Sequence, residues 1–139
     1  LEVNTLPNGM PERGDTITYY TKLSSAATSH YLTLGFGKNE SGGYEAKIAN
    51  SKVQLKTENT SNSTSYNVST GIWYKNTIQW GEATITYDIA PVGGSTVATV
   101  QLDDTEFDTG KITYEQNDTY PFGESSGTDG YFHHVTVKK

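Results

Sequence analysis

No cysteine occurs among the 139 residues of the chain. This absence excludes disulfide bonds, cysteine nucleophiles and cysteine-ligated zinc. Positive charge is also scarce, because ten Lys and Arg residues stand against sixteen Asp and Glu residues, which gives a formal net charge of −6. An acidic chain with scattered cations is a poor partner for nucleic acid or for an anionic membrane surface. No apolar run reaches the length of a membrane-spanning helix, so we expect no membrane insertion.

Helical periodicity is absent as well. No window repeats apolar residues at intervals of three and four, whereas short runs of alternating apolar and polar residues recur along the whole chain. Such alternation is typical of strands that bury one face. The residues predicted to share an inward face are Ile17, Tyr19, Thr21 and Leu23; Leu32, Leu34 and Phe36; Tyr44, Ala46 and Ile48; Val53 and Leu55; Tyr66 and Val68; Ile72, Tyr74, Ile78 and Trp80; Ile85, Tyr87 and Ile89; and Ala98, Val100 and Leu102.

Turn-forming segments such as "NESGG", "PVGG" and "FGESSGTDG" separate these runs. The segment "TENTSNSTS" is a polar linker, which we expect to form a mobile loop between strands. Many short strands at this spacing predict an antiparallel sandwich or barrel. The length suits one domain over residues 1–139. Because the chain begins with Leu1 rather than Met, we expect a piece of a larger extracellular protein, with that protein's other domains as partners.

Two segments resemble a known superfamily. The run "GIWYKNTIQW" (71–80) resembles the strand of laminin-G-like and concanavalin A-like domains in which a Gly-x-Trp-Tyr start leads into alternating apolar residues and a second Trp. The run "GYFHHVTV" (130–137) resembles their closing Phe-Asp-Asn-Val-x-Val strand, with His133 and His134 replacing Asp and Asn. The resemblance spans Gly14 to Val137. It implies an all-β, two-sheet antiparallel sandwich of the jelly-roll type and supports a fold rather than an activity.

The two tryptophans of the first segment have different expected roles. Trp80 shares the apolar face of its predicted strand and belongs to the core, whereas Trp73 lies on the polar face. A flat aromatic ring beside polar groups is a platform on which sugars stack, although a second sheet or the polar linker could also cover Trp73. The predicted ligand-binding residues are Trp73, Lys75, Gln79, Asp88, Tyr20 and Tyr120.

The densest group of carboxylates is "DDTEFD". Loop oxygens of this kind are ligands that calcium prefers. Asp103, Asp104, Glu106 and Asp108 therefore form a candidate structural calcium site, with a solvated acidic loop as the alternative. Glycoside hydrolases of the laminarinase type share the jelly-roll fold and use acids at alternating strand positions. Their Glu-Asp-Glu order is not reproduced here, so we predict no catalytic residues.

The three histidines suggest no metal centre. His133 and His134 are adjacent, so on a regular strand they point to opposite faces and do not share one ion. The third histidine, His30, is far from them in the sequence. The chain also lacks a phosphate-binding loop and a dinucleotide fingerprint.

These observations favour a non-catalytic carbohydrate-binding or adhesion module of a secreted or cell-surface protein, with a polysaccharide or glycan as its partner. The alternative is a structural or oligomerising domain of a surface, appendage or viral spike protein, and a glycoside hydrolase or lyase is a third reading. Glycosylation sequons fit an extracellular or cell-surface location, although a chain this rich in Asn, Ser and Thr produces some by chance. They begin at Asn39, Asn59, Asn62, Asn67 and Asn117.

Overall fold

The computed structural model describes residues 2–3, 5–24, 31–116 and 130–139. Those residues form eleven strands and contain no helix, and so no helix that could cross a bilayer. The strands are β1 (Glu2–Val3), β2 (Thr16–Leu23), β3 (Tyr31–Asn39), β4 (Gly42–Ala49), β5 (Lys52–Lys56), β6 (Ser61–Ser65), β7 (Trp73–Trp80), β8 (Thr84–Pro91), β9 (Ala98–Asp103), β10 (Lys111–Gln116) and β11 (Gly130–Lys138).

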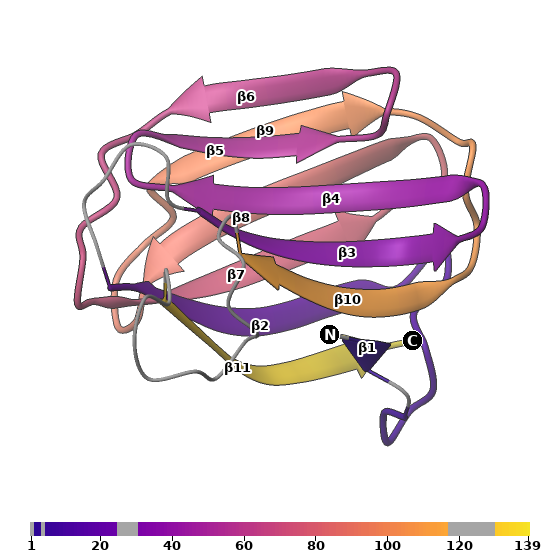
Figure 1. Ribbon diagram of the computed structural model, residues 1–139, viewed down its shortest axis with the longest axis horizontal. Helices are drawn as coiled ribbons and strands as arrows, with labels where there is room; N and C mark the ends of the chain where they lie inside the picture. Colours follow the sequence, from indigo (N-terminus) through magenta and orange to yellow (C-terminus); the bar gives the residue numbers. More distant parts are fainter. Residues whose placement is uncertain (1, 4, 25–30, 117–129) are drawn as a thin grey trace.

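The strands form two antiparallel sheets that stack face to face (Figure 1). The front sheet has the order β1-β10-β3-β4-β5-β6, and the rear sheet has the order β11-β2-β7-β8-β9. The chain runs through β2 in the rear sheet, β3 to β6 in front, β7 to β9 behind, β10 in front and β11 behind. Strands that switch sheets in this way make a jelly roll. The predicted all-β, two-sheet sandwich is confirmed.

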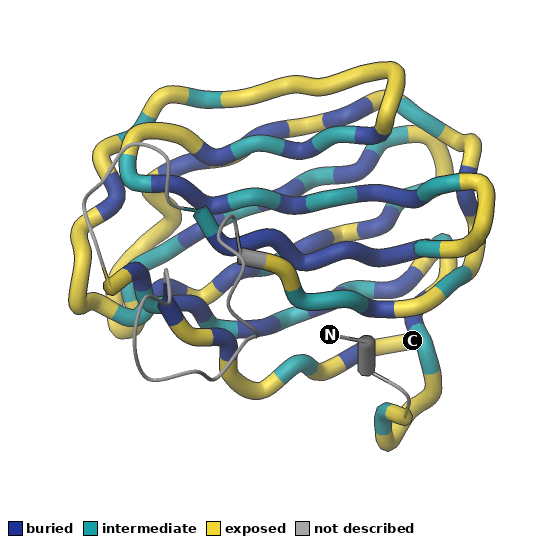
Figure 2. The backbone as a smooth tube through the Cα atoms, in the orientation of Figure 1, coloured by how far each residue is buried: buried dark blue, intermediate teal, exposed yellow. Residues whose placement is uncertain are grey.

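Alternating burial explains why these residues form strands. Buried and more exposed positions alternate along the tube in Figure 2. In β2, the inward side chains of Ile17, Tyr19, Thr21 and Leu23 are at most 1% exposed, while their neighbours face solvent. Successive side chains of a strand point to opposite faces, so a period of two in the sequence fixes which face meets the other sheet.

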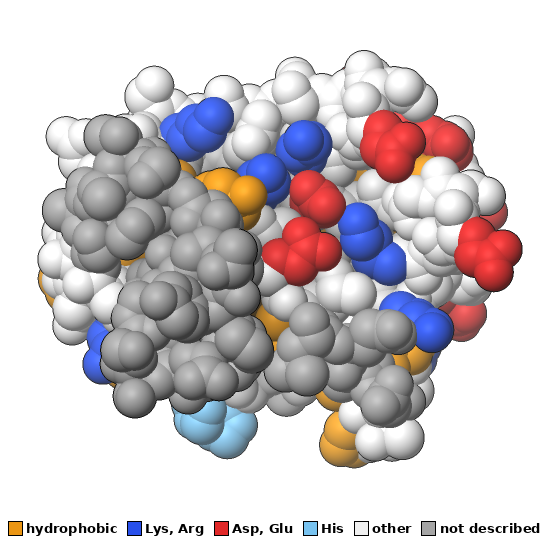
Figure 3. All heavy atoms as spheres, in the orientation of Figure 1, with side chains coloured by type: hydrophobic (Ala, Val, Ile, Leu, Met, Phe, Trp, Pro, Cys, Tyr) orange, Lys and Arg blue, Asp and Glu red, His pale blue; other side chains and the backbone are white. Residues whose placement is uncertain are grey.

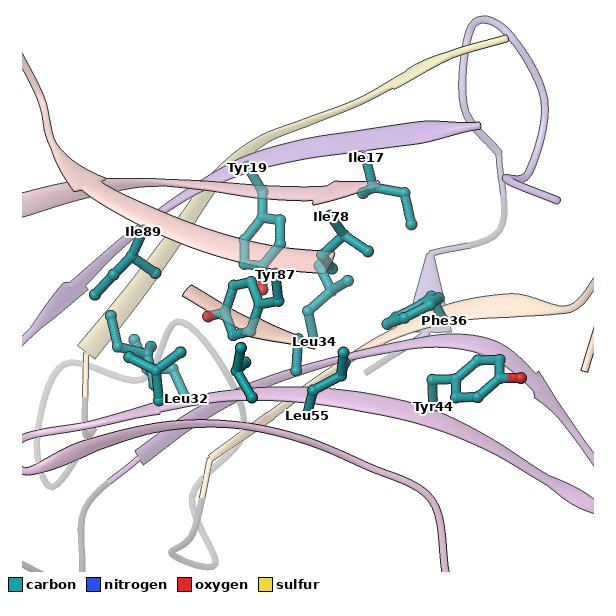
Figure 4. Close-up of a cluster of buried hydrophobic side chains, with 14 of the residues drawn as sticks. Ile17, Tyr19, Leu32, Leu34, Phe36, Tyr44, Leu55, Ile78, Tyr87 and Ile89 are labelled. Atoms are coloured by element: carbon teal, nitrogen blue, oxygen red, sulfur yellow. The ribbon is translucent and has the colours of Figure 1, made fainter. Parts of the chain in front are cut away.

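Aromatic side chains fill one end of the core. The indole of Trp80 is 1% exposed, which confirms its predicted place in the core. It packs edge-on against Phe36 and Tyr44, with ring centroids 5.2 and 5.9 Å away. Figure 4 shows Phe36 and Tyr44 lying together at one side of the cluster. Large rings such as these let a chain of only 33% apolar residues fill a sandwich.

Asn76 is the polar exception on the inner face of β7. It is fully buried, and its side-chain amide donates to the Thr21 hydroxyl at 2.9 Å. Its side-chain carbonyl accepts from the Tyr87 hydroxyl at 2.6 Å. Buried polar groups are tolerated where they are hydrogen-bonded. This network joins β2, β7 and β8 in the middle of the rear sheet.

The polar linker 57–65 is a loop only over residues 57–60, so the prediction is wrong for the rest of it. Ser61–Ser65 form β6, which pairs with β5 from Lys56↔Ser61 to Lys52↔Ser65. Its side chains bond to the edge of the rear sheet, because Asn62 donates to the Gln101 carbonyl at 2.6 Å and Thr64 to the Thr99 carbonyl at 3.0 Å. Polar contacts hold this strand, so apolar alternation does not reveal it.

Two details of the predicted core are also wrong. Ile72 does not join the inward face of β7, because that strand begins at Trp73 and Ile72 is 44% exposed. Tyr66 and Val68 do not form a strand of their own. They follow β6, where Val68 is buried and Tyr66 packs partly against the core.

Candidate binding groove

The outer face of the rear sheet carries a groove of about 540 Å³ near the first residues of β7 and the last residues of β2 and β8. Strand register brings its side chains together. Lys22 lies opposite both Tyr131 and Trp73, and Tyr20 lies opposite both His133 and Lys75. The residues that line the groove are Tyr20, Ile72, Trp73, Val92, His133 and His134.

A β-bulge in β11 places two histidines on one side of the sheet. The pairing of β11 with β2 shifts between His133 and Thr136, and His134 has a φ of 51°. A bulge adds a residue to one strand and interrupts the alternation of its side chains. The ring centroids of His133 and His134 are therefore only 3.7 Å apart. The prediction that these side chains point to opposite faces is wrong, because β11 is not a regular strand at this point.

Lys22 lies beside the groove, opposite its lining residue Trp73 in the strand register. Its Nζ atom is 5.1 Å from the ring centroid of Trp73 and 5.4 Å from that of Tyr131. The ammonium group is thus held against two aromatic rings, an arrangement that the negative faces of the rings favour. The ring of His133 is tilted against Trp73, with centroids 5.9 Å apart. The groove therefore combines aromatic surface with cationic or ionisable nitrogen atoms.

The predicted ligand-binding residues fall into separate places. Tyr20 and Trp73 line the groove, and Trp73 is half-buried rather than fully covered. Lys75 and Asp88 line a neighbouring depression of about 410 Å³, and Gln79 is exposed and lines neither. Tyr120 lies outside the described residues. Only two of the six predicted residues therefore meet in one groove, and that any of them binds a ligand stays a prediction.

Four lining residues were missed as ligand-binding candidates. Val92 and Ile72 are 60% and 44% exposed and lie in turns beside strand ends, where a period of two gives no information. His133 and His134 come to the groove through the bulge. The sequence offered one signal, the two histidines that replace Asp and Asn in the closing strand, but only the structure places that strand in the same sheet as Trp73.

The predicted calcium loop forms a different structure. Asp104 accepts a hydrogen bond from the Tyr44 hydroxyl at 2.6 Å, and Asp108 forms an ion pair with Arg13 at 2.7 Å. Asp103 accepts from the Thr84 hydroxyl at 2.7 Å. Within the described residues, no three His, Cys, Asp or Glu side chains are placed to hold a metal ion. The structure therefore gives the predicted calcium site at Asp103, Asp104, Glu106 and Asp108 no support.

Arg13 organises this loop. Its Nε donates to Asp108, one terminal nitrogen donates to the carbonyls of Gly81 and Asp104 at 2.9 and 3.3 Å, and the other donates to the Tyr44 hydroxyl at 3.0 Å and the Phe107 carbonyl at 2.5 Å. All five donors of the guanidinium are used. Burial, reinforced by the bond to Asp104, raises the pKa of Tyr44 above its usual value. The acidic loop is therefore hydrogen-bonded to the core residue Tyr44, directly through Asp104 and indirectly through Arg13.

No protein-family model matches the chain, and no curated protein matches its sequence. Solved structures share its fold at low identity. The agglutinin CG-16 from chicken liver superposes with a TM-score of 0.63 at 10% identity, covering 99% of this chain and 95% of that one. The carbohydrate-binding module CBM66 from Bacillus subtilis gives 0.62 at 12% identity, covering 93% and 84%.

A toad ovary galectin in complex with thio-digalactose gives a TM-score of 0.63 at 6% identity, covering 91% of each chain. At these identities the likenesses show the fold alone. The chain is a jelly-roll β-sandwich, similar in architecture to this galectin and to this bacterial module. The closer resemblance to laminin-G-like domains stays a prediction.

Proposed function

We propose that the chain is a non-catalytic carbohydrate-binding module whose sugar lies in the groove over Tyr20 and Trp73. The observation that carries the proposal is the half-buried Trp73 ring in a groove whose other walls are a tyrosine, two histidines and two aliphatic side chains. A pyranose ring has apolar C–H faces and a rim of hydroxyls. Aromatic rings offer apolar surface to such faces, and phenol and imidazole groups can exchange hydrogen bonds with the rim.

The scaffold supports this proposal. Tyr20 and Trp73 project from neighbouring strands of one sheet, so the sheet fixes their relative positions, as precise binding sites require. The groove is formed by few side chains, so binding is weak. We expect dissociation constants between micromolar and millimolar, or about −8 to −4 kcal/mol.

The comparisons add support at the level of architecture. Among the structures with this fold, one is a bacterial carbohydrate-binding module and another is a galectin bound to thio-digalactose. We also propose a secreted or cell-surface location for the module. In support, the sequon asparagines Asn39, Asn59, Asn62 and Asn67 all lie at exposed positions.

The proposal is tested by titrating the protein with a panel of polysaccharides in an affinity gel and by calorimetry. Trp73→Ala should lower affinity for a bound glycan by about tenfold or more, because it removes the stacking surface. Tyr31→Ala is the matched control, since it removes an aromatic side chain from β3 in the other sheet. Loss of binding in Tyr31→Ala, with Trp73→Ala unaffected, would place the site on the front sheet.

Exposed apolar side chains near the groove favour a second candidate, a module that binds protein. Ile72, Val92 and Tyr131 are 44%, 60% and 40% exposed. Clusters of exposed apolar residues are typical of interaction surfaces. In this case the chain would be a structural or oligomerising domain. Analytical ultracentrifugation would then show self-association, and the substitution Val92→Ser would weaken it. A monomer at high concentration would contradict self-association at this surface.

A further inference from the structure

The groove differs in charge from the rest of the molecule. The chain has a formal net charge of −6, and on the front face lysine and acidic side chains are interspersed (Figure 3), as in the pair of Lys38 and Glu45 at 3.1 Å. Around the groove, by contrast, the charged and ionisable nitrogen groups are Lys22, Lys75, His133 and His134. Among the described residues, no Asp or Glu lines the groove.

Lys22 is the cation best placed to meet a ligand. Within the described part of the chain it forms no ion pair with a carboxylate, unlike Lys38 with Glu45 and Lys139 with Asp15. Its Nζ atom lies against the rings of Trp73 and Tyr131, beside the groove that Trp73 lines. A positive charge held by rings rather than by an acid remains available to an anion from outside.

Asp88, an acid on the same face, is directed elsewhere. Asp88 lies opposite Thr77 and Thr99 in the register and accepts a hydrogen bond from the Thr99 hydroxyl. It lines the neighbouring depression beside Lys75 and not the groove. A negatively charged ligand in the groove therefore meets Lys22 and the two histidines before it meets Asp88.

On this basis, and resting on the carbohydrate-binding function proposed above, we propose that the groove selects acidic saccharides, whose pyranose rings carry a carboxylate. The sugar ring lies on Trp73, and its carboxylate pairs with Lys22 and accepts hydrogen bonds from His133 and His134. Charge-assisted bonds of this kind are about twice as strong as neutral ones. Neutral sugars of the same shape can stack but gain nothing from the cations.

The histidines make this selectivity depend on pH. Histidine gains its positive charge as pH falls from about 8 to 5, whereas sugar carboxylates remain ionised over that range. Besides the histidines, the titratable groups on the side of the ligand are Lys22, Tyr20 and Tyr131 and, one row away, Lys75. Asp88 lies at the neighbouring depression. The positive charge at the groove rises as the solution becomes more acidic, so affinity for an acidic saccharide should rise as well.

The test compares oligogalacturonides with the same oligosaccharides after reduction of their carboxyl groups, titrated by calorimetry into the intact protein at pH 5.5 and pH 8. We expect the acidic form to bind at least about tenfold more tightly at pH 5.5, because each charge-assisted bond adds to the shared stacking. The difference should shrink at pH 8 and at high salt.

Lys22→Met keeps the apolar stem but removes the charge, so it should lower affinity for the acidic form about three- to tenfold and leave the neutral form unchanged. Lys52→Met is the matched control, because Lys52 is exposed on β5 in the other sheet.

If the acidic and neutral forms bind equally and Trp73→Ala lowers the affinity for both, acidic selectivity is overturned and the carbohydrate proposal stands. If neither form binds and a wider neutral panel also fails, the proposed function itself is overturned. An equal loss in Lys22→Met and Lys52→Met would show a general charge effect and overturn the site.

Discussion

At the scale of single residues, the one arginine of the sequence shows how a polar side chain can stabilise this fold. The side chain of Arg13 is only 8% exposed, and its five donors serve the loop after β9, the Gly81 carbonyl after β7 and the hydroxyl of Tyr44. Its partner Asp108 is 72% exposed, so the charge pair itself is a small part of the effect. The main contribution is the bonding of part-buried carbonyl groups that would otherwise lose their donor.

Arg13→Ala should therefore lower the free energy of unfolding by about 2–4 kcal/mol, because several part-buried acceptors lose their donor. Arg13→Lys should recover only part of this, since an ammonium cannot reproduce the planar set of five donors. Asp108→Asn is the control and should cost less than about 1 kcal/mol. Urea unfolding measures all three. A larger loss for Asp108→Asn than for Arg13→Ala would show that the ion pair, and not the carbonyl bonds, carries the stability.

The place of a single residue could be predicted from the sequence only where its burial follows the alternation of apolar and polar residues along a strand. Trp80 was correctly placed in the core and Trp73 on the opposite face. The function of Asp104 and Asp108 could not be predicted, because their partner Arg13 is about ninety residues away in the sequence and only the folded chain brings them together. Acids that are neighbours in the sequence can be mistaken for a cation site for the same reason. Their hydrogen-bonding partners, here Arg13 and Tyr44, are distant in the sequence and cannot be read from the local pattern.

At the scale of elements, alternation predicted the strands that have one apolar face and failed for the others. The strands β2, β3, β4, β5, β7, β8 and β9 are those whose predicted inward residues are buried. The polar β6 depends on pairing with β5 and on side-chain bonds to β9. The bulge in β11 depends on its register with β2. Neither feature leaves a local pattern, and the bulge decides that His133 and His134 share the groove.

The bulge yields a test at this scale. His134 has a φ of 51°, in the left-handed region, which glycine adopts without strain and β-branched residues adopt at a cost. His134→Val should lower the free energy of unfolding by about 1–2 kcal/mol, whereas His134→Gly should be close to neutral. Thr136→Val, at an exposed position of the same strand, is the control. If His134→Val were as stable as the wild type in urea, the left-handed bulge would be wrong.

At the scale of the whole molecule, the core combines apolar packing with buried tyrosines. Tyr19 and Tyr87 are at most 1% exposed, and burial raises the pKa of each hydroxyl above its usual range. Burial also raises the pKa of Tyr114 to about 12. The folded state therefore holds these protons more tightly than the unfolded chain, in which tyrosine has a pKa of about 10. Their contribution to stability is complete below pH 10 and is lost as pH rises toward the folded values.

The free energy of unfolding should accordingly fall between about pH 10 and pH 12, by as much as about 1.4 kcal/mol per pH unit for each such tyrosine. Urea unfolding across this range measures the fall. Tyr114→Phe removes one of the hydroxyl groups with a raised pKa and should therefore reduce the fall. A stability that stays flat up to pH 12 would contradict the buried positions of these hydroxyl groups.

The most direct measurement of the central claim, that the groove on the rear sheet binds a glycan, uses the two tryptophans as reporters. Each indole N–H gives its own signal in a ¹H–¹⁵N nuclear magnetic resonance spectrum, and Trp80 is 1% exposed whereas Trp73 lines the groove. On titration with a bound oligosaccharide, the Trp73 signal should shift to saturation together with the backbone signals of Tyr20 and His133, while Trp80 should stay in place. Unchanged Trp73 and Tyr20 signals, with shifts at Lys47 and Gln54 on the front sheet instead, would contradict the account.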